Sequence, residues 1–356
     1  MFHEILIAVM AGFAILGAVD RIFGNRWGLG KEFEEGVLAM GSLALAMVGI
    51  VSLAPVLARL LKPVVVPIFG FLGADPAMFA GTILACDMGG GALALEMTEN
   101  HQAAMLGGVL NGSMLGATIV FTIPVAMGIL REEDRPAMAK GILCGIVTIP
   151  LGILAGGLTA GFAPMMVLRN LIPIVIIGGL IALGLWKAEN AMVRGFAAFG
   201  KGVVALVTAA LGAAILEELA GITLIPGLAP LSEGFQTVGA IAIVLAGAFP
   251  LVAVITKLLR RPLLALGGRL GIGDTGAAGL IASLANSIAA LNLVKDMNYR
   301  GKVVNIAFAV SAAFVFGDHL GFTAGFAPEM LLPMILGKLT GGIGAIALAL
   351  LLTKEQ

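Results

Sequence analysis

The chain has 356 residues, of which 60% are hydrophobic and 12% charged, and its formal net charge is zero. A soluble domain is about 25% charged, so this composition excludes an ordinary soluble enzyme, and the lack of a basic excess excludes a nucleic-acid-binding protein. The two cysteines, Cys86 and Cys144, lie in apolar stretches without partner spacing. We therefore expect no disulfide, no metal site and no cofactor.

Apolar stretches long enough to cross a membrane recur along the whole chain. In chain order they are Glu4–Val19, Gly36–Ala58, Pro76–Met97, His101–Leu130, Pro136–Gly161, Met166–Trp186, Gly195–Ala220, Glu233–Leu259, Thr275–Val294, Tyr299–His319 and Glu329–Thr353. The first stretch lacks a basic leader region, so we expect it to be a retained span. The pattern predicts an all-α polytopic membrane protein with a single domain over residues 1–356.

The sequence also repeats itself at an offset of 198–199 residues. The matched pairs include Pro63 with Pro262, Asp75 with Asp274, Asp87 with Asn286, and Lys140 with Lys338. The constant offset predicts two five-segment repeats, over about 1–161 and about 191–356, joined by a linker helix over about 162–190. Paired repeats of this kind are typical of transporters.

The distribution of basic residues predicts the topology, because cytoplasmic loops hold the excess of Lys and Arg. If all eleven segments are plain transmembrane helices, the 21 cations divide 13 to 8 between the two sides. If 76–97 and 275–294 are instead re-entrant hairpins, they divide 17 to 4. We therefore predict nine crossings and two hairpins, with inverted repeats, the N-terminus outside and the C-terminus cytoplasmic. Eleven plain helices are the alternative.

The hairpins indicate where a solute binds. A re-entrant tip exposes backbone polar groups and is tolerated only where protein or water surrounds it. Asp87 and the matched Asn286 fall at the two tips, and an ionisable residue at membrane depth is a functional candidate. The predicted substrate-binding residues are Asp87, Gly89, Gly90, Asn111, Ser113, Asn286, Ser287, Asn292, Asp318 and His319.

Structural roles compete with binding at several of these positions. Asp87 also suits a helix cap, and Asn111 and Ser113 also suit hydrogen bonds between helices. The Asp318–His319 pair, which we expect near a membrane edge, suits a proton relay or cation binding.

The stretch "FGFLGADPAMFAGTILACDMGGGALALEM", followed by the Asn-Gly-Ser span and by "GDHLGF", resembles the EutH-type membrane proteins of ethanolamine utilisation, the ethanolamine permeases. The resemblance extends over the whole chain. It implies a carrier in the bacterial inner membrane that admits ethanolamine, and not an enzyme. Asp87 would then hold the ammonium group, while Asn111 and Asn286 would read the hydroxyl.

The order of segments also resembles that of elevator-type carriers, which implies a homodimer in membrane lipid and alternating access. Two other functions stay open at this point. One is an ion-coupled carrier of another small polar solute, and the other is a membrane sensor of the amine.

Overall fold

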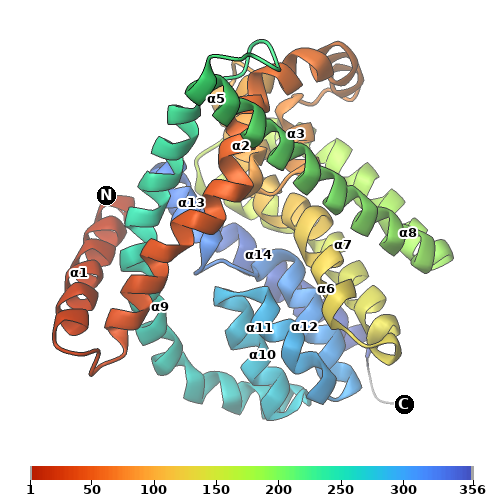
Figure 1. Ribbon diagram of the computed structural model, residues 1–356. Coiled ribbons are helices and arrows are strands. Elements are labelled where there is room, and N and C mark those ends of the chain that lie inside the picture. Colours follow the sequence, from red (N-terminus) through yellow and green to blue (C-terminus); the bar gives the residue numbers. More distant parts are fainter. Residues whose placement is uncertain (1, 354–356) are drawn as a thin grey trace.

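The structure is a computed structural model that describes residues 2–353, and every regular element in that range is helical (Figure 1). Lys354 is one of the 21 basic residues used above to predict the topology, and it lies outside the described residues. The long helices are α1 (Phe2–Ile22), α2 (Leu29–Phe71), α7 (Arg135–Thr159), α8 (Pro164–Ala220), α9 (Leu231–Leu270) and α14 (Leu331–Leu352).

The segment His101–Ile129 is also long and continuous, but much of it is wound as π-helix, a form that is frequent at functional sites. It consists of α5 (His101–Ala104), η2 (Met105–Gly116), η3 (Thr118–Thr122) and α6 (Ile123–Ile129). With it, seven helical segments in the described range are long and apolar enough to cross a membrane. The chain is therefore a helical membrane protein, as its composition predicts.

The remaining helices are short. They are α3 (Ala77–Ile83), η1 (Cys86–Met88), α4 (Gly90–Met97), η4 (Glu132–Asp134), α10 (Gly273–Ala285), α11 (Ser287–Leu293), η5 (Val294–Asp296), α12 (Tyr299–Ala312), α13 (Asp318–Phe326) and η6 (Pro328–Met330). Helix α3 packs against α4, and α10 packs against α11. The predicted span Tyr299–His319 contains α12 and a break at 313–317, and α13 begins at the end of that span.

Two boundaries differ from the sequence prediction. The stretches 62–71 and 261–270, which lie outside the predicted spans, continue α2 and α9 without a break despite Pro63, Pro67 and Pro262. Conversely, α8 covers both the linker and the following span, and its backbone leaves helical geometry at Ala188, where two helices meet at a kink.

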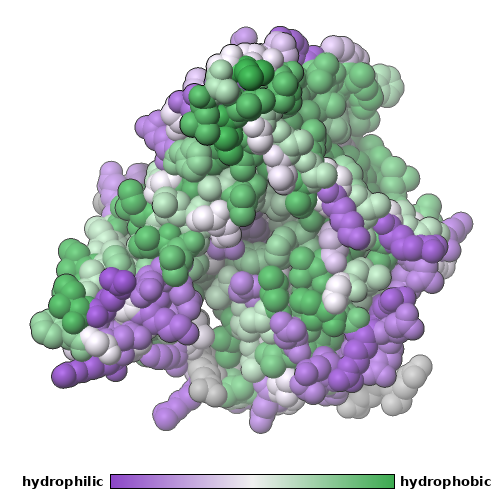
Figure 2. All heavy atoms as spheres, viewed as in Figure 1, coloured by the Kyte–Doolittle hydropathy of each residue, from purple (hydrophilic) through white to green (hydrophobic). Residues whose placement is uncertain are grey.

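The core is formed by two long helix pairs. Helix α2 lies along α9, and α7 lies along α14. Small residues allow the second pair to approach closely: a Cβ added to Gly152 would lie 2.7 Å from the Gly337 carbonyl oxygen. Outside the core, Figure 2 shows apolar side chains over much of the visible face, and hydrophilic residues gather along its lower part. That distribution is expected for a surface in contact with lipid.

Candidate functional site

The first element of the site is the break between α3 and α4. Leu84 and Ala85 are extended, and Gly89 has a φ of 91°, which an L side chain rarely adopts. The Ala85 carbonyl accepts hydrogen bonds from the backbone N–H groups of Met88 and Gly90. The chain thus makes one short turn, η1, in the middle of an apolar segment, and this turn carries Asp87.

The second element is the break between α12 and α13, which the sequence does not predict. Phe314 has a φ of 62°, uncommon for a bulky residue. Its N–H donates to the Ser283 carbonyl at 3.0 Å, and the Phe316 N–H donates to the Leu284 carbonyl at 2.8 Å. The end of α10 therefore satisfies backbone groups that the break frees, and α13 begins with Asp318 and His319.

These two breaks bring an acid and a histidine together. The Nε2 atom of His319 lies 3.7 Å from Oδ1 of Asp87, with the two side chains 3% and 14% exposed. Above them, the Phe314 ring lies 5.3 Å from the His319 ring and 5.5 Å from that of Phe121. Residues more than 190 positions apart in the chain thus form one buried polar cluster with an aromatic side.

A cavity of about 650 Å³ opens onto this cluster. Asp87, Asp318 and His319 line it together with Phe121 and Phe314, and most of its remaining wall is apolar. A mainly apolar pocket with a few convergent polar groups is the usual form of a small-molecule site.

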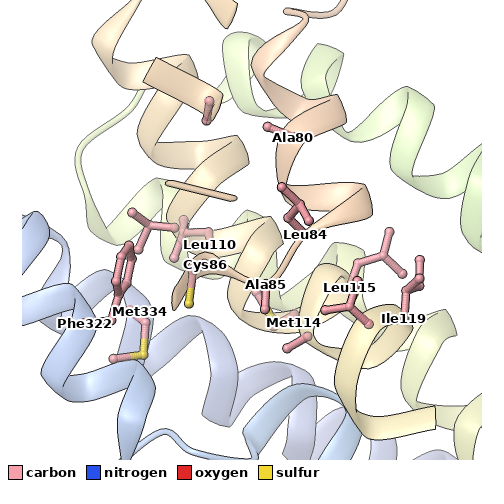
Figure 3. Close-up of a cluster of buried hydrophobic side chains, with 14 of the residues drawn as sticks. Ala80, Leu84, Ala85, Cys86, Leu110, Met114, Leu115, Ile119, Phe322 and Met334 are labelled. Carbon is pink, nitrogen blue, oxygen red and sulfur yellow. The ribbon is translucent and has the colours of Figure 1, made fainter. Parts of the chain in front are cut away.

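A second cavity of about 410 Å³ includes Cys86, Gly89, Glu96, Phe322 and Phe326 in its wall. The short turn η1 therefore borders two cavities, because Asp87 and Met88 face the first while Cys86 and Gly89 face the second. Cys86 itself belongs to the apolar cluster that Figure 3 shows with Leu110, Phe322 and Met334.

Asp87, Cys86 and His319 are also the residues that could hold a metal ion. One ligand atom from each lies within 4.8 Å of the others.

The structure gathers three of the ten predicted site residues at the first cavity: Asp87, Asp318 and His319. Gly89 and Gly90 shape the turn beside them, and a Cβ on Gly90 would lie 2.7 Å from the Ala85 carbonyl oxygen.

The other predicted residues lie elsewhere. Asn111 donates to the Met78 carbonyl and to Thr82 Oγ1, and Ser113 donates to the Leu110 carbonyl. Asn286 caps α11 by accepting from the Ile288 N–H, beside the buried Ser287. Asn292 donates to the Ile288 carbonyl and faces a separate small cavity. Their binding role stays a prediction.

Two residues near the cluster were not predicted. Lys338 lies on α14 with 1% exposure, and its Nζ donates to the Ser113 carbonyl. A lysine in the middle of an apolar span is itself a sign of a functional site. The count of basic residues on each side of the membrane, however, treated Lys338 as a loop residue. Phe314 offered no signal, because nothing local distinguishes it from other phenylalanines of the spans.

The sequence comparisons agree with the resemblance seen in the motifs. The family model described as "Ethanolamine utilisation protein, EutH" matches residues 2–352. A "Probable ethanolamine permease EutH" from Listeria monocytogenes is 57% identical over 354 residues, covering 99% of this chain and 95% of the relative. A relative with the same name from Escherichia coli is 45% identical, covering 99% of this chain and 96% of the relative.

A protein from Bacillus subtilis named YxeR is 51% identical, with coverage of 99% and 96%. No solved structure matches the chain. The relatives named permeases belong by name to a class of transporters and not of enzymes. With a family model that extends over almost every residue and relatives at this level of identity, the chain belongs to the EutH family of ethanolamine utilisation proteins.

Proposed function

We propose that this protein carries ethanolamine, in its protonated form, across the bacterial inner membrane. The observation that carries the proposal is the Asp87–His319 pair, placed with Asp318 at the wall of a cavity where two membrane segments are broken. An ionisable group at such a depth is costly to maintain and is usually retained for a solute or ion pathway.

The chemistry of the cavity suits a small amino alcohol. The Asp87 carboxylate is a charge-assisted acceptor for the ammonium group, and one of its oxygens, Oδ1, makes no hydrogen bond in the described structure. The Phe121 and Phe314 side chains line the same cavity, and aromatic rings attract cations. His319 Nδ1 is buried and also without a hydrogen bond in the described structure, so it can meet the hydroxyl.

The arrangement of elements supports transport rather than sensing. The helix pairs α3–α4 and α10–α11 are the proposed re-entrant hairpins, each lying in one of two inverted repeats. Cavities border η1 on two sides, which suits alternating access with Asp87 at the centre. By analogy with elevator-type carriers, we propose that a homodimer provides the fixed scaffold.

Replacement of Asp87 by Asn tests the proposal. The amide keeps the shape of the side chain and removes its charge, so the ammonium loses a charge-assisted bond worth about 1.5–3 kcal/mol. We expect the KM for labelled ethanolamine uptake into proteoliposomes to rise about 10–100-fold. Asp296→Asn, an exposed carboxylate beyond the second hairpin, is the matched control and should leave KM unchanged.

The same assay separates the competing functions. A sensor would bind ethanolamine without moving it, so wild-type vesicles would accumulate no label. A carrier of another solute would show uptake of ethanolamine that nucleosides or dicarboxylates outcompete. Asp87→Asn protein that inserts normally and transports with the wild-type KM would remove Asp87 from the site.

A further inference from the structure

Lys338 is a buried basic residue that no described carboxylate contacts within salt-bridge distance. It is 1% exposed, its Nζ donates to the Ser113 carbonyl, and within the described residues it forms no ion pair. An ammonium has three donors, and burying it costs several kcal/mol unless an opposite charge compensates. We therefore expect the charge of Lys338 to have a function that a neutral side chain could not perform.

A carboxylate of the proposed site lies close in the fold to the Lys338 amine. Gly112, next to Ser113, packs against Cys86, since an added Cβ would lie 3.1 Å from the Cys86 backbone nitrogen. Asp87 follows Cys86 directly, and its carboxylate interacts electrostatically with the Lys338 ammonium. The Ser113 carbonyl and the Asp87 carboxylate are thus alternative acceptors for one long, flexible side chain.

We propose that Lys338 is a tethered substitute for the substrate. This inference rests on the proposed function, because it assumes that Asp87 binds a protonated amine. Lys338 and ethanolamine both present a primary ammonium group. When the solute occupies Asp87, Lys338 stays on the Ser113 carbonyl; when the solute leaves, the Lys338 ammonium moves to Asp87.

The exchange of ammonium groups has a consequence for the transport cycle. An unloaded carrier that reorients with a bare buried carboxylate faces a large desolvation penalty. With Lys338 at Asp87, the carboxylate is paired in both halves of the cycle, while Asp318 remains a second acidic side chain at the wall of the same cavity. The carrier can then return empty without binding a coupling cation at Asp87.

Replacing Lys338 by Met tests this role, because Met fills a similar volume and carries no charge. Net uptake into empty proteoliposomes requires the unloaded return step, whereas exchange of external label for internal unlabelled ethanolamine does not. We expect Lys338→Met to keep exchange within about threefold of wild type and to lower net uptake by at least about tenfold. Lys140→Met changes the lysine matched to Lys338 in the predicted repeat, which is half-buried and donates to the Leu352 carbonyl, and should lower neither rate.

A second variant separates charge from hydrogen bonding. Lys338→Gln retains a donor for the Ser113 carbonyl but has no charge, so it should show the same loss of net uptake. The proposal is overturned if Gln restores net uptake, or if exchange and net uptake fall together in Met and Gln protein with wild-type ethanolamine binding. Wild-type vesicles that perform neither assay would instead refute the proposed function itself.

Discussion

At the scale of single residues, the conformation of Gly89 determines where Asp87 points. Its φ of 91° lies in the left-handed region, and an added Cβ would lie 2.2 Å from Cγ2 of Ile50. Gly89→Ala should therefore strain the backbone by about 1–2 kcal/mol and also displace η1 from α2. We expect a lower melting temperature in detergent and reduced ethanolamine uptake.

The control for this change is Gly128→Ala in α6, where an added Cβ meets nothing within 4 Å. Alanine there removes the helix penalty of glycine, about 0.8–1.0 kcal/mol, so this variant should keep or raise the melting temperature. Gly89→Ala protein with wild-type stability and uptake would show that η1 does not need the left-handed conformation.

The sequence analysis predicted the acidic residues and the histidine of the buried cluster. It did not predict Lys338, the buried lysine nearby. Asp87, Asp318 and His319 are ionisable residues within apolar stretches of the sequence, and that alone makes them candidates for a binding site. Lys338 carries the same signal, but a loop count treats a cation as belonging to one side of the membrane. Only packing reveals that the four-carbon stem runs into the interior towards Ser113.

At the scale of elements, Asn111 joins the π-helical segment to α3. Its Nδ2 donates to the Met78 carbonyl at 3.2 Å and to Thr82 Oγ1 at 3.1 Å, and the side chain is fully buried. Asn111→Ala leaves these acceptors without their donor, a cost of about 1–3 kcal/mol. We expect a lower melting temperature with an unchanged KM for uptake, because Asn111 does not line the cavity of Asp87.

A rise in KM without loss of stability would contradict this expectation and would restore Asn111 as a reader of the hydroxyl. The neighbouring Ser113→Ala serves as a comparison. Its hydroxyl bonds only to the Leu110 carbonyl of its own helix, so its removal should affect stability less than Asn111→Ala.

The breaks in the helices differ in how far sequence predicts them. The break at 84–89 follows from three consecutive glycines beside an aspartate, a local signal for an unwound turn. The break at 313–317 has no such signal, since Ala313, Phe314 and Val315 are ordinary residues of an apolar helix. It is made by hydrogen bonds to the end of α10, and such tertiary partners cannot be predicted from local composition. For this reason Asp318 and His319, which were expected near a membrane edge, lie between two helices, because α13 continues from them to Phe326.

At the scale of the whole molecule, contacts between distant loops support the nine-crossing topology. His101 pairs with Glu329 at 3.5 Å, and the Asp75 N–H donates to Asn170 Oδ1 at 2.7 Å. Lys302 pairs with Asp134. If 76–97 and 275–294 crossed completely, the two partners of each contact would belong to opposite sides of the membrane. Two hairpins that return to their own side bring every one of these partners together.

The helix pairs of the core support the predicted repeats in a similar way. Helices α2 and α9 contain the matched Pro63 and Pro262, and α7 and α14 contain the matched Lys140 and Lys338. Each pair packs helices that are equivalent in the two predicted repeats against each other. Such self-pairing is expected around a pseudo-twofold axis, which inverted repeats possess.

Labelling of single cysteines tests this topology directly. The native Cys86 and Cys144 are buried, so an impermeant thiol reagent should report only on introduced sites. The nine-crossing topology places the exposed Lys62 and Glu99 on one face and the exposed Glu133 and Lys295 on the other. We expect Lys62→Cys and Glu99→Cys to react in intact cells, and Glu133→Cys and Lys295→Cys to react only after permeabilisation. Because the first hairpin alone decides whether Glu99 shares a face with Lys62, labelling of these two positions from opposite sides would replace the hairpin by a full crossing. The segments α3 and α4 would then be two halves of one broken crossing, and the proposed inverted repeats would lose their basis.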